Sequence, residues 1–376
     1  QSYPVLLASR FLQACGNGVL IPLVHLVAVA VDPEERRGYA LGLSGMVIAF
    51  APVFGPTISG IVTDLLGWRM NFVMLACAAS VAWVVAFFTI RDIGTHFPVK
   101  LDPLSCASFA GGLTCLLVAV SIAEREGLAS LGFLLPAAGA MACLALFIVR
   151  QLIIPNPLLK LRLFKRKTFA LGVILAGLAQ IAVLAGPLQA SLFMQNECGN
   201  MALAVGFVLL PGALANAFAN TPAGSFYDRF GMVPCMSVGL SLLAFGSGMF
   251  VVFDSSVSVV WVAIAHAIRM IGLAFLVMPT TAYCMTGLDD SETKHATAII
   301  NAVRQVVGSM GSNLLIALMA VVTVRWAPGD IAAAEGLSLL GFHVSFGLQA
   351  AIFAILIVVV VASIGGRGKE NKAPLK

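Results

Sequence analysis

Long apolar stretches, separated by short polar segments, dominate the chain. Each stretch has about 20 residues or more, the length that an α-helix needs to cross roughly 30 Å of hydrocarbon. The apolar residues run on without alternating with polar ones, so the pattern does not favour the strands of a membrane barrel. It predicts an all-α polytopic membrane protein with eleven spanning helices, at residues 4–30, 39–63, 69–90, 103–123, 131–149, 168–194, 201–222, 233–253, 257–285, 296–324 and 340–364.

Composition and charge add an orientation to this picture. Of the 376 residues, 60% are hydrophobic and 10% are charged, whereas soluble domains have about a quarter charged residues. If the loop at 31–38 is cytoplasmic and the sides alternate, sixteen lysines and arginines fall on the cytoplasmic side and three on the other. Cytoplasmic loops carry such an excess. We therefore expect an outside N-terminus and a cytoplasmic C-terminus in a plasma or inner membrane. The net charge of +5 does not indicate a nucleic-acid partner.

A first span whose N-terminus lies outside, with no leader segment before it, is unusual. The sequence begins with Gln1 and has no initiator methionine. We therefore expect that an odd number of earlier spans precedes this chain and that the sequence is a fragment.

The sequence lacks the motifs that indicate catalysis, metal binding or ATP binding. The eight cysteines fall mostly in or beside apolar stretches, where a thiol packs as a small apolar group. Their spacings do not match a zinc site, and we expect no metal and no cofactor. There is no nucleophile–base set and no phosphate-binding loop of the GxxxxGK[ST] type, so we expect neither an enzyme nor an ATP-driven pump.

Polar side chains inside the spans are the main functional candidates. A charge at bilayer depth costs about 2.5–3.5 kcal/mol on insertion scales, and such residues tend to be functional. In the first span, Arg10, Gln13 and Asn17 are three and four residues apart and share one helix face. Later spans carry Asn216, Asn220, His266, Arg269, Asn301, Arg304 and Gln305. These faces either line one central cavity for protons and substrate, or they join helices by hydrogen bonds of about 0.6 kcal/mol each.

All seventeen acidic residues lie in loops or at the ends of spans. A proton-coupled carrier usually needs a carboxylate of raised pKa inside its cavity. The three intramembrane arginines, Arg10, Arg269 and Arg304, therefore have no intramembrane acid partner in this sequence.

Two further segments suggest moving parts. The second span places Ala51, Pro52, Gly55, Pro56 and Gly60 at spacings of four, which indicates a hinge or a tight helix–helix seam.

The segment "GSFYDRFGM" at 224–232 is predicted to be a loop, with Gly224 and Gly231 permitting a tight turn. Asp228 would face the positive start of the next helix, and Arg229 would bridge to a carbonyl or an acid. The segment is either a cytoplasmic gate or a solvated turn.

A distant repeat and a basic connection suggest the domain organisation. Arg10 followed by Pro22 echoes Arg269 followed by Pro279, and repeated halves are typical of secondary transporters. The leucines and basic residues at 150–169 suit a helix on the cytoplasmic membrane surface; receptor docking is the alternative. The predicted domains are 1–92, with three spans; 93–150, with two spans; 151–167, a basic amphipathic cytoplasmic linker; and 168–376, a six-span bundle with a basic cytoplasmic tail.

Several of these segments resemble motifs of the major facilitator superfamily. "GSFYDRFG" resembles its cytoplasmic loop motif, "RFLQACGNGVLIP" its fourth-span motif, and "GMVIAFAPVFGPTISG" its fifth-span antiporter motif. The stretches "DLLGWRMNFVM" and "LLKLRLFKRKTF" are also similar to the family. The whole chain resembles the fourteen-span drug:proton antiporters, beginning just before their fourth span. The resemblance implies that residues 1–92 hold the last three spans of an N-terminal bundle and that 93–150 are two extra central spans. It also implies a coupling carboxylate on the earlier spans.

The resemblance implies a role for each motif. Arg10 would take part in proton coupling, the five residues from Ala51 to Gly60 would form the antiporter hinge, and the loop glycines with Asp228 and Arg229 would gate the cytoplasmic side. Ala14, Ala51 and Ser59 stand where the family usually has glycine, and Met232 replaces a basic residue. The first three changes keep small side chains, whereas the last weakens the charge contacts of the gate.

The expected function is multidrug or organic-compound efflux by proton antiport with alternating access. The expected partners are a small-molecule substrate, protons, the lipid bilayer and the missing N-terminal spans. Two alternatives remain open: an exporter of an anionic metabolite, since three unpaired arginines favour a negative substrate, and a non-transporting truncated remnant or scaffold.

Overall fold

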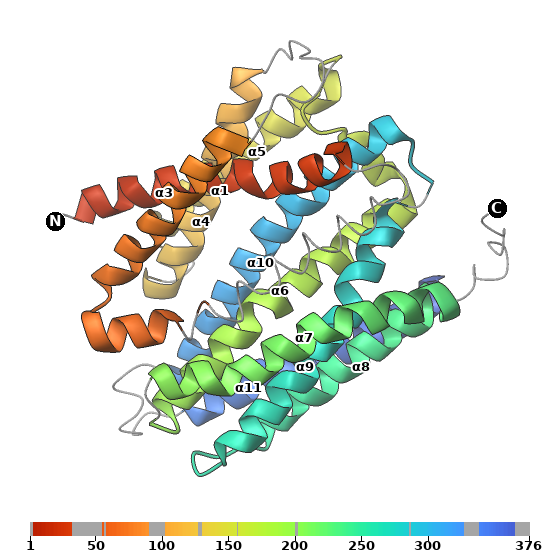
Figure 1. Cartoon of the computed structure of the whole chain (residues 1–376). Coiled ribbons are helices and arrows are strands. Elements are labelled where there is room, and N and C mark those ends of the chain that lie inside the picture. Colours follow the sequence, from red (N-terminus) through yellow and green to blue (C-terminus); the bar gives the residue numbers. More distant parts are fainter. Residues whose placement is uncertain are drawn as a thin grey trace. The chain divides into compact units, whose positions relative to one another are not determined.

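The structure, a computed structural model, describes residues 3–31, 55, 58–89, 102–126, 130–155, 157–199, 202–285, 287–326 and 338–364. Within these ranges the chain is helical apart from short connections and contains no strand (Figure 1). The helices are α1 (Tyr3–Val31), α3 (Arg69–Thr89), α4 (Pro103–Glu126), α5 (Leu131–Ile153), α6 (Lys167–Asn196), α7 (Ala202–Phe230), α8 (Met232–Val251), α9 (Val259–Met285), α10 (Asp290–Trp326) and α11 (Leu339–Ile364), with a short 3₁₀ helix η2 (Leu161–Lys165).

The helices confirm the predicted all-α membrane class. In the described ranges, nine helices, α3 to α11, are long and apolar enough to cross a membrane. They coincide with the last nine predicted spans. The first predicted span corresponds to α1, and the second lies mostly outside the described residues. Many large apolar side chains are exposed on these helices, as expected of surfaces that face lipid.

The chain divides into two compact units, residues 1–98 and 99–376. The first contains α1, a helical segment at 58–66 and α3. The second contains the helices from α4 onward. The finer domain boundaries expected from the sequence remain predictions.

Close helix contacts organise the second unit. Helix α8 packs against α9 and α11, α7 packs against α9, and α6 packs against α9 and α10 (Figure 1). A Cβ on Gly239 of α8 would lie 2.7 Å from the carbonyl oxygen of Gly272 in α9, so glycine is required there for the two backbones to meet. Phe250 of α8 and Phe346 of α11 stack with their ring centroids 4.3 Å apart.

The basic connection between α5 and α6 is less helical than the sequence suggested. Only Leu161–Lys165 forms a helix, and it is a 3₁₀ helix. Pro155 and Pro157 lie before it, and proline removes a backbone donor and disfavours helix in the preceding residue. Leu163 is buried and anchors this short helix to the unit.

The predicted loop at 224–232 is wrong in its extent. Helix α7 continues to Phe230, and α8 begins at Met232, so Gly224, Asp228 and Arg229 all lie on helix. Phe226 packs on Phe230, with ring centroids 4.5 Å apart, as an i, i+4 pair that supports the last turn of α7.

Gly231 alone forms the corner between α7 and α8. Its φ of 81° and ψ of −176° lie in a region that is essentially restricted to glycine.

We expect Gly231→Ala to lower the free energy of unfolding by about 1–3 kcal/mol, because alanine is strained at this φ and ψ. Gly224→Ala is the matched control: Gly224 is helical and a Cβ there would meet nothing within 4 Å. Thermal unfolding of both purified variants in detergent measures the difference. Equal melting temperatures for the two variants would contradict the assignment of Gly231 as the corner.

Candidate functional site

A buried arginine lies among the helices of the second unit. Arg269 on α9 is 2% exposed, and its Nη2 donates a hydrogen bond of 2.9 Å to Oε1 of Gln349 on α11. Nε2 of Gln349 donates to Oε1 of Gln189 on α6 at 2.6 Å, and Nε2 of Gln189 donates to Oγ of Ser345 at 2.7 Å. One chain of hydrogen bonds therefore joins α9, α11 and α6. We call Arg269, Gln349, Gln189 and Ser345 the arginine network.

Small and aromatic residues shape the space around Arg269. A Cβ on Gly186 of α6 would lie 3.1 Å from Nη2 of Arg269, and a Cβ on Gly246 of α8 would lie 2.6 Å from its Cγ. Cζ of Arg269 lies 5.1 Å from the ring centroid of Phe346 and 5.9 Å from that of Phe250. Glycines on two facing helices thus leave room for the side chain, while aromatic faces lie next to its charge.

The surroundings of Arg269 do not fully satisfy it. Its Nε and Nη1 have no hydrogen-bond partner among the described residues, and no described carboxylate pairs with it. A hydrogen bond between spanning helices contributes about 0.6 kcal/mol on average, less than the roughly 2.5–3.5 kcal/mol that an intramembrane arginine costs. Because packing alone does not repay this cost, the residue is a functional candidate.

His266 lies one turn before Arg269 on the same helix. It is 1% exposed, and its Nδ1 has no partner among the described residues. Its ring lies against Gly212 of α7, where any side chain would collide with the imidazole. The structure thus buries the two candidates His266 and Arg269 together.

The predicted polar face of α10 makes no hydrogen bond to the arginine network among the described residues. Arg304 is partly buried, and its Nη2 donates to Oγ1 of Thr281 at 2.7 Å and to the carbonyl oxygen of Val277 at 3.3 Å. Asn301 and Gln305 are exposed. These three residues therefore belong to a separate surface from the buried Arg269.

The two asparagines of α7 form helix contacts. Nδ2 of Asn216 donates to the carbonyl oxygen of Met270 on α9 at 2.7 Å, and Nδ2 of Asn220 donates to the carbonyl oxygen of Asn216 at 2.8 Å. Both side chains are partly buried. Asn216 acts here as a link between α7 and α9.

The candidates on the first predicted span lie in the first unit. Arg10, Gln13 and Asn17 are exposed on α1, and Nη1 of Arg10 donates to Oε1 of Gln13 at 3.0 Å. Cζ of Arg10 lies 4.5 Å from the ring centroid of Phe72 on α3. Arg10 and Asn71 both line an open pocket of about 520 Å³ in this unit.

The hinge and gate candidates are only partly described. Ala51, Pro52 and Pro56 lie outside the described residues, whereas Gly55 and Gly60 are helical and Gly60 is buried. At the gate, Cζ of Arg229 lies 5.3 Å from the ring centroid of its neighbour Phe230. The side chain of Asp228 lies outside the described part of the structure, so its contact with the start of α8 stays a prediction.

Sequence reasoning missed the glutamines of the arginine network. Gln189 and Gln349 are uncharged amides inside apolar spans, and each stands in the tripeptide Leu-Gln-Ala. The same tripeptide contains Gln13 on α1, which accepts a hydrogen bond from Arg10. This recurrence of one tripeptide in three spans is the signal that would have identified both residues. In the described ranges, no three His, Cys, Asp or Glu side chains gather as metal ligands would.

Apolar helices of spanning length, with hydrogen-bonded charges inside them, define an integral membrane protein of the kind that carries substrates or ions. Comparison with known families is specific: the model of the Major Facilitator Superfamily matches residues 1–312. The chain belongs to this superfamily of transporters.

Named relatives include transporters linked to drug export. The chain is 31% identical to an uncharacterized MFS-type transporter, YcnB, of Bacillus subtilis, over 85% of this chain and 67% of the relative. It is 29% identical to the lincomycin resistance protein LmrB of the same species, over 97% of this chain and 76% of the relative. It is 25% identical to the multidrug export protein EmrB of Haemophilus influenzae, over 83% and 62% respectively.

We expect Gln349→Leu to destabilise the protein by about 2–3 kcal/mol, because it leaves a buried guanidinium without its acceptor. Gln349→Glu restores an acceptor and adds a negative charge, and the amide of Gln189 can rotate to donate to it. This variant is expected to melt at or above the temperature of the unchanged protein. Thermal unfolding in detergent compares the two variants, and a Gln349→Leu protein as stable as the parent would refute the contribution of this hydrogen bond.

Proposed function

We propose that this chain is a secondary active transporter that exports amphipathic or cationic organic compounds in exchange for protons, by alternating access. The observation that carries the proposal is its membership of the Major Facilitator Superfamily together with relatives named for lincomycin resistance and multidrug export. We further propose that it is of the fourteen-span drug:proton type, with its N-terminus outside and its C-terminus in the cytoplasm.

The polar groups inside the spans support roles in coupling. Arg10 borders an open pocket and has a neutral partner, Gln13, so its charge is accessible to a substrate or to a carboxylate. We propose Arg10 as the coupling residue, and we propose that Asn301, Arg304 and Gln305 line the substrate pathway from the exposed side of α10. Arg269 and His266 are buried, and we propose that they stabilise the helices that form the pathway without lining it.

The helix ends support the proposed cytoplasmic gate. The glycine corner at Gly231 sets the direction in which α8 leaves α7, and Arg229 lies on the last turn of α7. We propose that Asp228 and Arg229 make contacts there that change between the two access states.

An anionic substrate is the second candidate. Among the described residues, Arg10, Arg269 and Arg304 have no carboxylate partner. A positive group that borders an open pocket without a counter-charge, as Arg10 does, favours a negative ligand.

Dye efflux separates these functions. The protein, expressed from its complete coding region in cells, is loaded with a fluorescent cationic dye or with an anionic one, with and without a protonophore. Efflux of the cationic dye that the protonophore abolishes is the expected result. Efflux of the anionic dye alone would instead select the anion exporter, and efflux of neither would favour the non-transporting alternative.

We expect Arg10→Ala to reduce proton-driven efflux to the background of cells without the protein, because it removes the proposed coupling charge. Arg69→Ala is the matched control, since Arg69 is an exposed arginine of the same unit, stacked over Trp68 at 4.5 Å. Membrane insertion of both variants is checked by their amount in isolated membranes. Full proton-driven efflux by a membrane-inserted Arg10→Ala protein would contradict the proposed role of Arg10 in coupling.

A further inference from the structure

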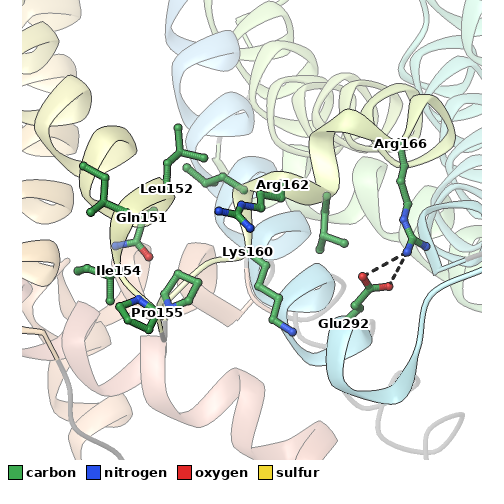
Figure 2. Close-up of a pocket in the computed structure, with 12 residues that line it drawn as sticks. Gln151, Leu152, Ile154, Pro155, Lys160, Arg162, Arg166 and Glu292 are labelled. Atoms are coloured by element: carbon green, nitrogen blue, oxygen red, sulfur yellow. Dashed lines mark hydrogen bonds and ion pairs between the residues drawn. The ribbon is translucent and has the colours of Figure 1, made fainter.

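A second polar pocket lies where the end of α5, the α5–α6 connection and the start of α10 meet (Figure 2). Its volume is about 330 Å³. Three basic side chains, Lys160, Arg162 and Arg166, and one acidic side chain, Glu292, line it. None of these residues belongs to the arginine network or to the candidates in the spans, so the pocket is a separate site.

The pocket has an excess of positive charge. Nη2 of Arg166 lies 3.0 Å from Oε2 of Glu292, and Nη1 of Arg166 donates to the carbonyl oxygen of Gly287 at 2.5 Å. Arg166 and Glu292 therefore neutralise each other, as Figure 2 shows. The side chains of Lys160 and Arg162 make no hydrogen bond or ion pair with another described residue. Their two charges remain available to a ligand.

The connection that carries these two cations is held in place from both sides. Oε1 of the buried Gln151 accepts a hydrogen bond from the backbone N–H of Leu159 at 3.1 Å. Nδ1 of His295 on α10 lies 3.2 Å from the carbonyl oxygen of Leu158. Because these contacts fix the two residues directly before Lys160, the pocket is formed before any ligand arrives, and a ligand would not have to order the chain.

Helix α5 is joined to α4 at the same end. Nε2 of Gln151 donates to Oγ of Ser105 at 2.8 Å, and Nε of Arg150 lies 2.6 Å from Oδ2 of Asp102. The Arg150 guanidinium and a hydrogen bond from Ser105 hold the pKa of Asp102 below its ordinary value. The carboxylate of Asp102 is thus charged and occupied by Arg150, and it leaves Lys160 and Arg162 unpaired.

The rim of the pocket is apolar. Leu152 and Ile153, on the last turn of α5, line it and are 44% and 74% exposed. This turn ends a helix of spanning length, so its exposed side chains lie at the level where hydrocarbon meets headgroups. A ligand with an anionic head and an apolar tail matches both parts of the pocket.

We propose that this pocket binds a phosphate group through Lys160 and Arg162, with an anionic phospholipid headgroup or a free phosphate ion as the two sources. The apolar rim favours the lipid. On the orientation expected from the basic residues, the pocket lies on the cytoplasmic face, where anionic lipids are concentrated. A bound headgroup would tie the α5–α6 connection to the membrane surface.

The test measures binding to purified protein, from its complete coding region, after removal of co-purified lipid in detergent. The probes are a short-chain phosphatidylglycerol, a phosphatidylcholine with the same chains, and inorganic phosphate. The site variant is Lys160→Gln with Arg162→Gln. The matched control is Lys165→Gln with Lys167→Gln, which removes the same charge from exposed neighbours that do not line the pocket.

The expected result is that phosphatidylglycerol binds more tightly than phosphatidylcholine, and that the site variant binds it about 30-fold more weakly while the control changes little. If the site variant weakens the binding of inorganic phosphate, and the parent protein does not prefer phosphatidylglycerol to phosphatidylcholine, the result would support the pocket with the free phosphate ion as its ligand. An equal loss of phosphatidylglycerol affinity in the site and control variants would overturn the proposal. So would a parent protein that binds neither phosphatidylglycerol nor inorganic phosphate.

Arg162→Gln alone provides a second variant if the double variant does not fold. Its side chain is exposed and without a described partner, so its removal disturbs no packing. A loss of about fivefold is expected for this single charge, and unchanged phosphatidylglycerol affinity in this folded variant would overturn the proposal as well.

Discussion

The guanidinium of Arg269 is held inside the second unit by one amide acceptor and two aromatic rings. The surrounding packing leaves this charge only 2% exposed. Glycines occur where α6 and α8 approach the side chain, and the stacked Phe250 and Phe346 close the space around it. The amides of Gln349 and Gln189 then carry the hydrogen bonding on to α6 and α11. Helices α9, α11 and α6 are therefore joined through the side chains of Arg269, Gln349 and Gln189.

The choice of an amide as partner for Arg269 has a consequence for movement between helices. A buried ion pair is costly to separate, since each partner left behind is an uncompensated charge, with losses of about 3–5 kcal/mol. An arginine–glutamine contact leaves only one charge behind, and bonds between spanning helices average about 0.6 kcal/mol. The contact between Arg10 and Gln13 in the first unit pairs the same two residue types. In each case a neutral amide orients the arginine, but only the Arg269–Gln349 bond joins two helices. A neutral partner there can release the arginine when α9 and α11 move, which suits a protein proposed to alternate between two states.

The connections between α7 and α8 and between α5 and α6 are stabilised in different ways. At the α7–α8 corner, the backbone conformation of Gly231 replaces a loop and sets the angle between two helices directly. Between α5 and α6, two prolines interrupt helix formation. The connection is held by the hydrogen bond that Gln151 accepts from Leu159 and by the contact of His295 with the carbonyl oxygen of Leu158. The basic side chains there are thus presented by a fixed segment, and their charge is directed at one pocket instead of being spread over a helix surface.

The membrane class, the positions of nine helices of spanning length and the placement of Arg269 and His266 within one of them could be predicted from the amino-acid sequence. These features depend on local hydrophobicity, because a segment enters the bilayer according to its own transfer free energy. The sequence alone misjudged the segment at 224–232, since its glycines and charges read as a loop although the aromatic pair of Phe226 and Phe230 continues the helix. It also passed over Gln189 and Gln349, whose importance arises only when α6, α9 and α11 are brought together. The contacts between side chains of different helices depend on how whole helices rotate and pack, which local hydrophobicity does not specify.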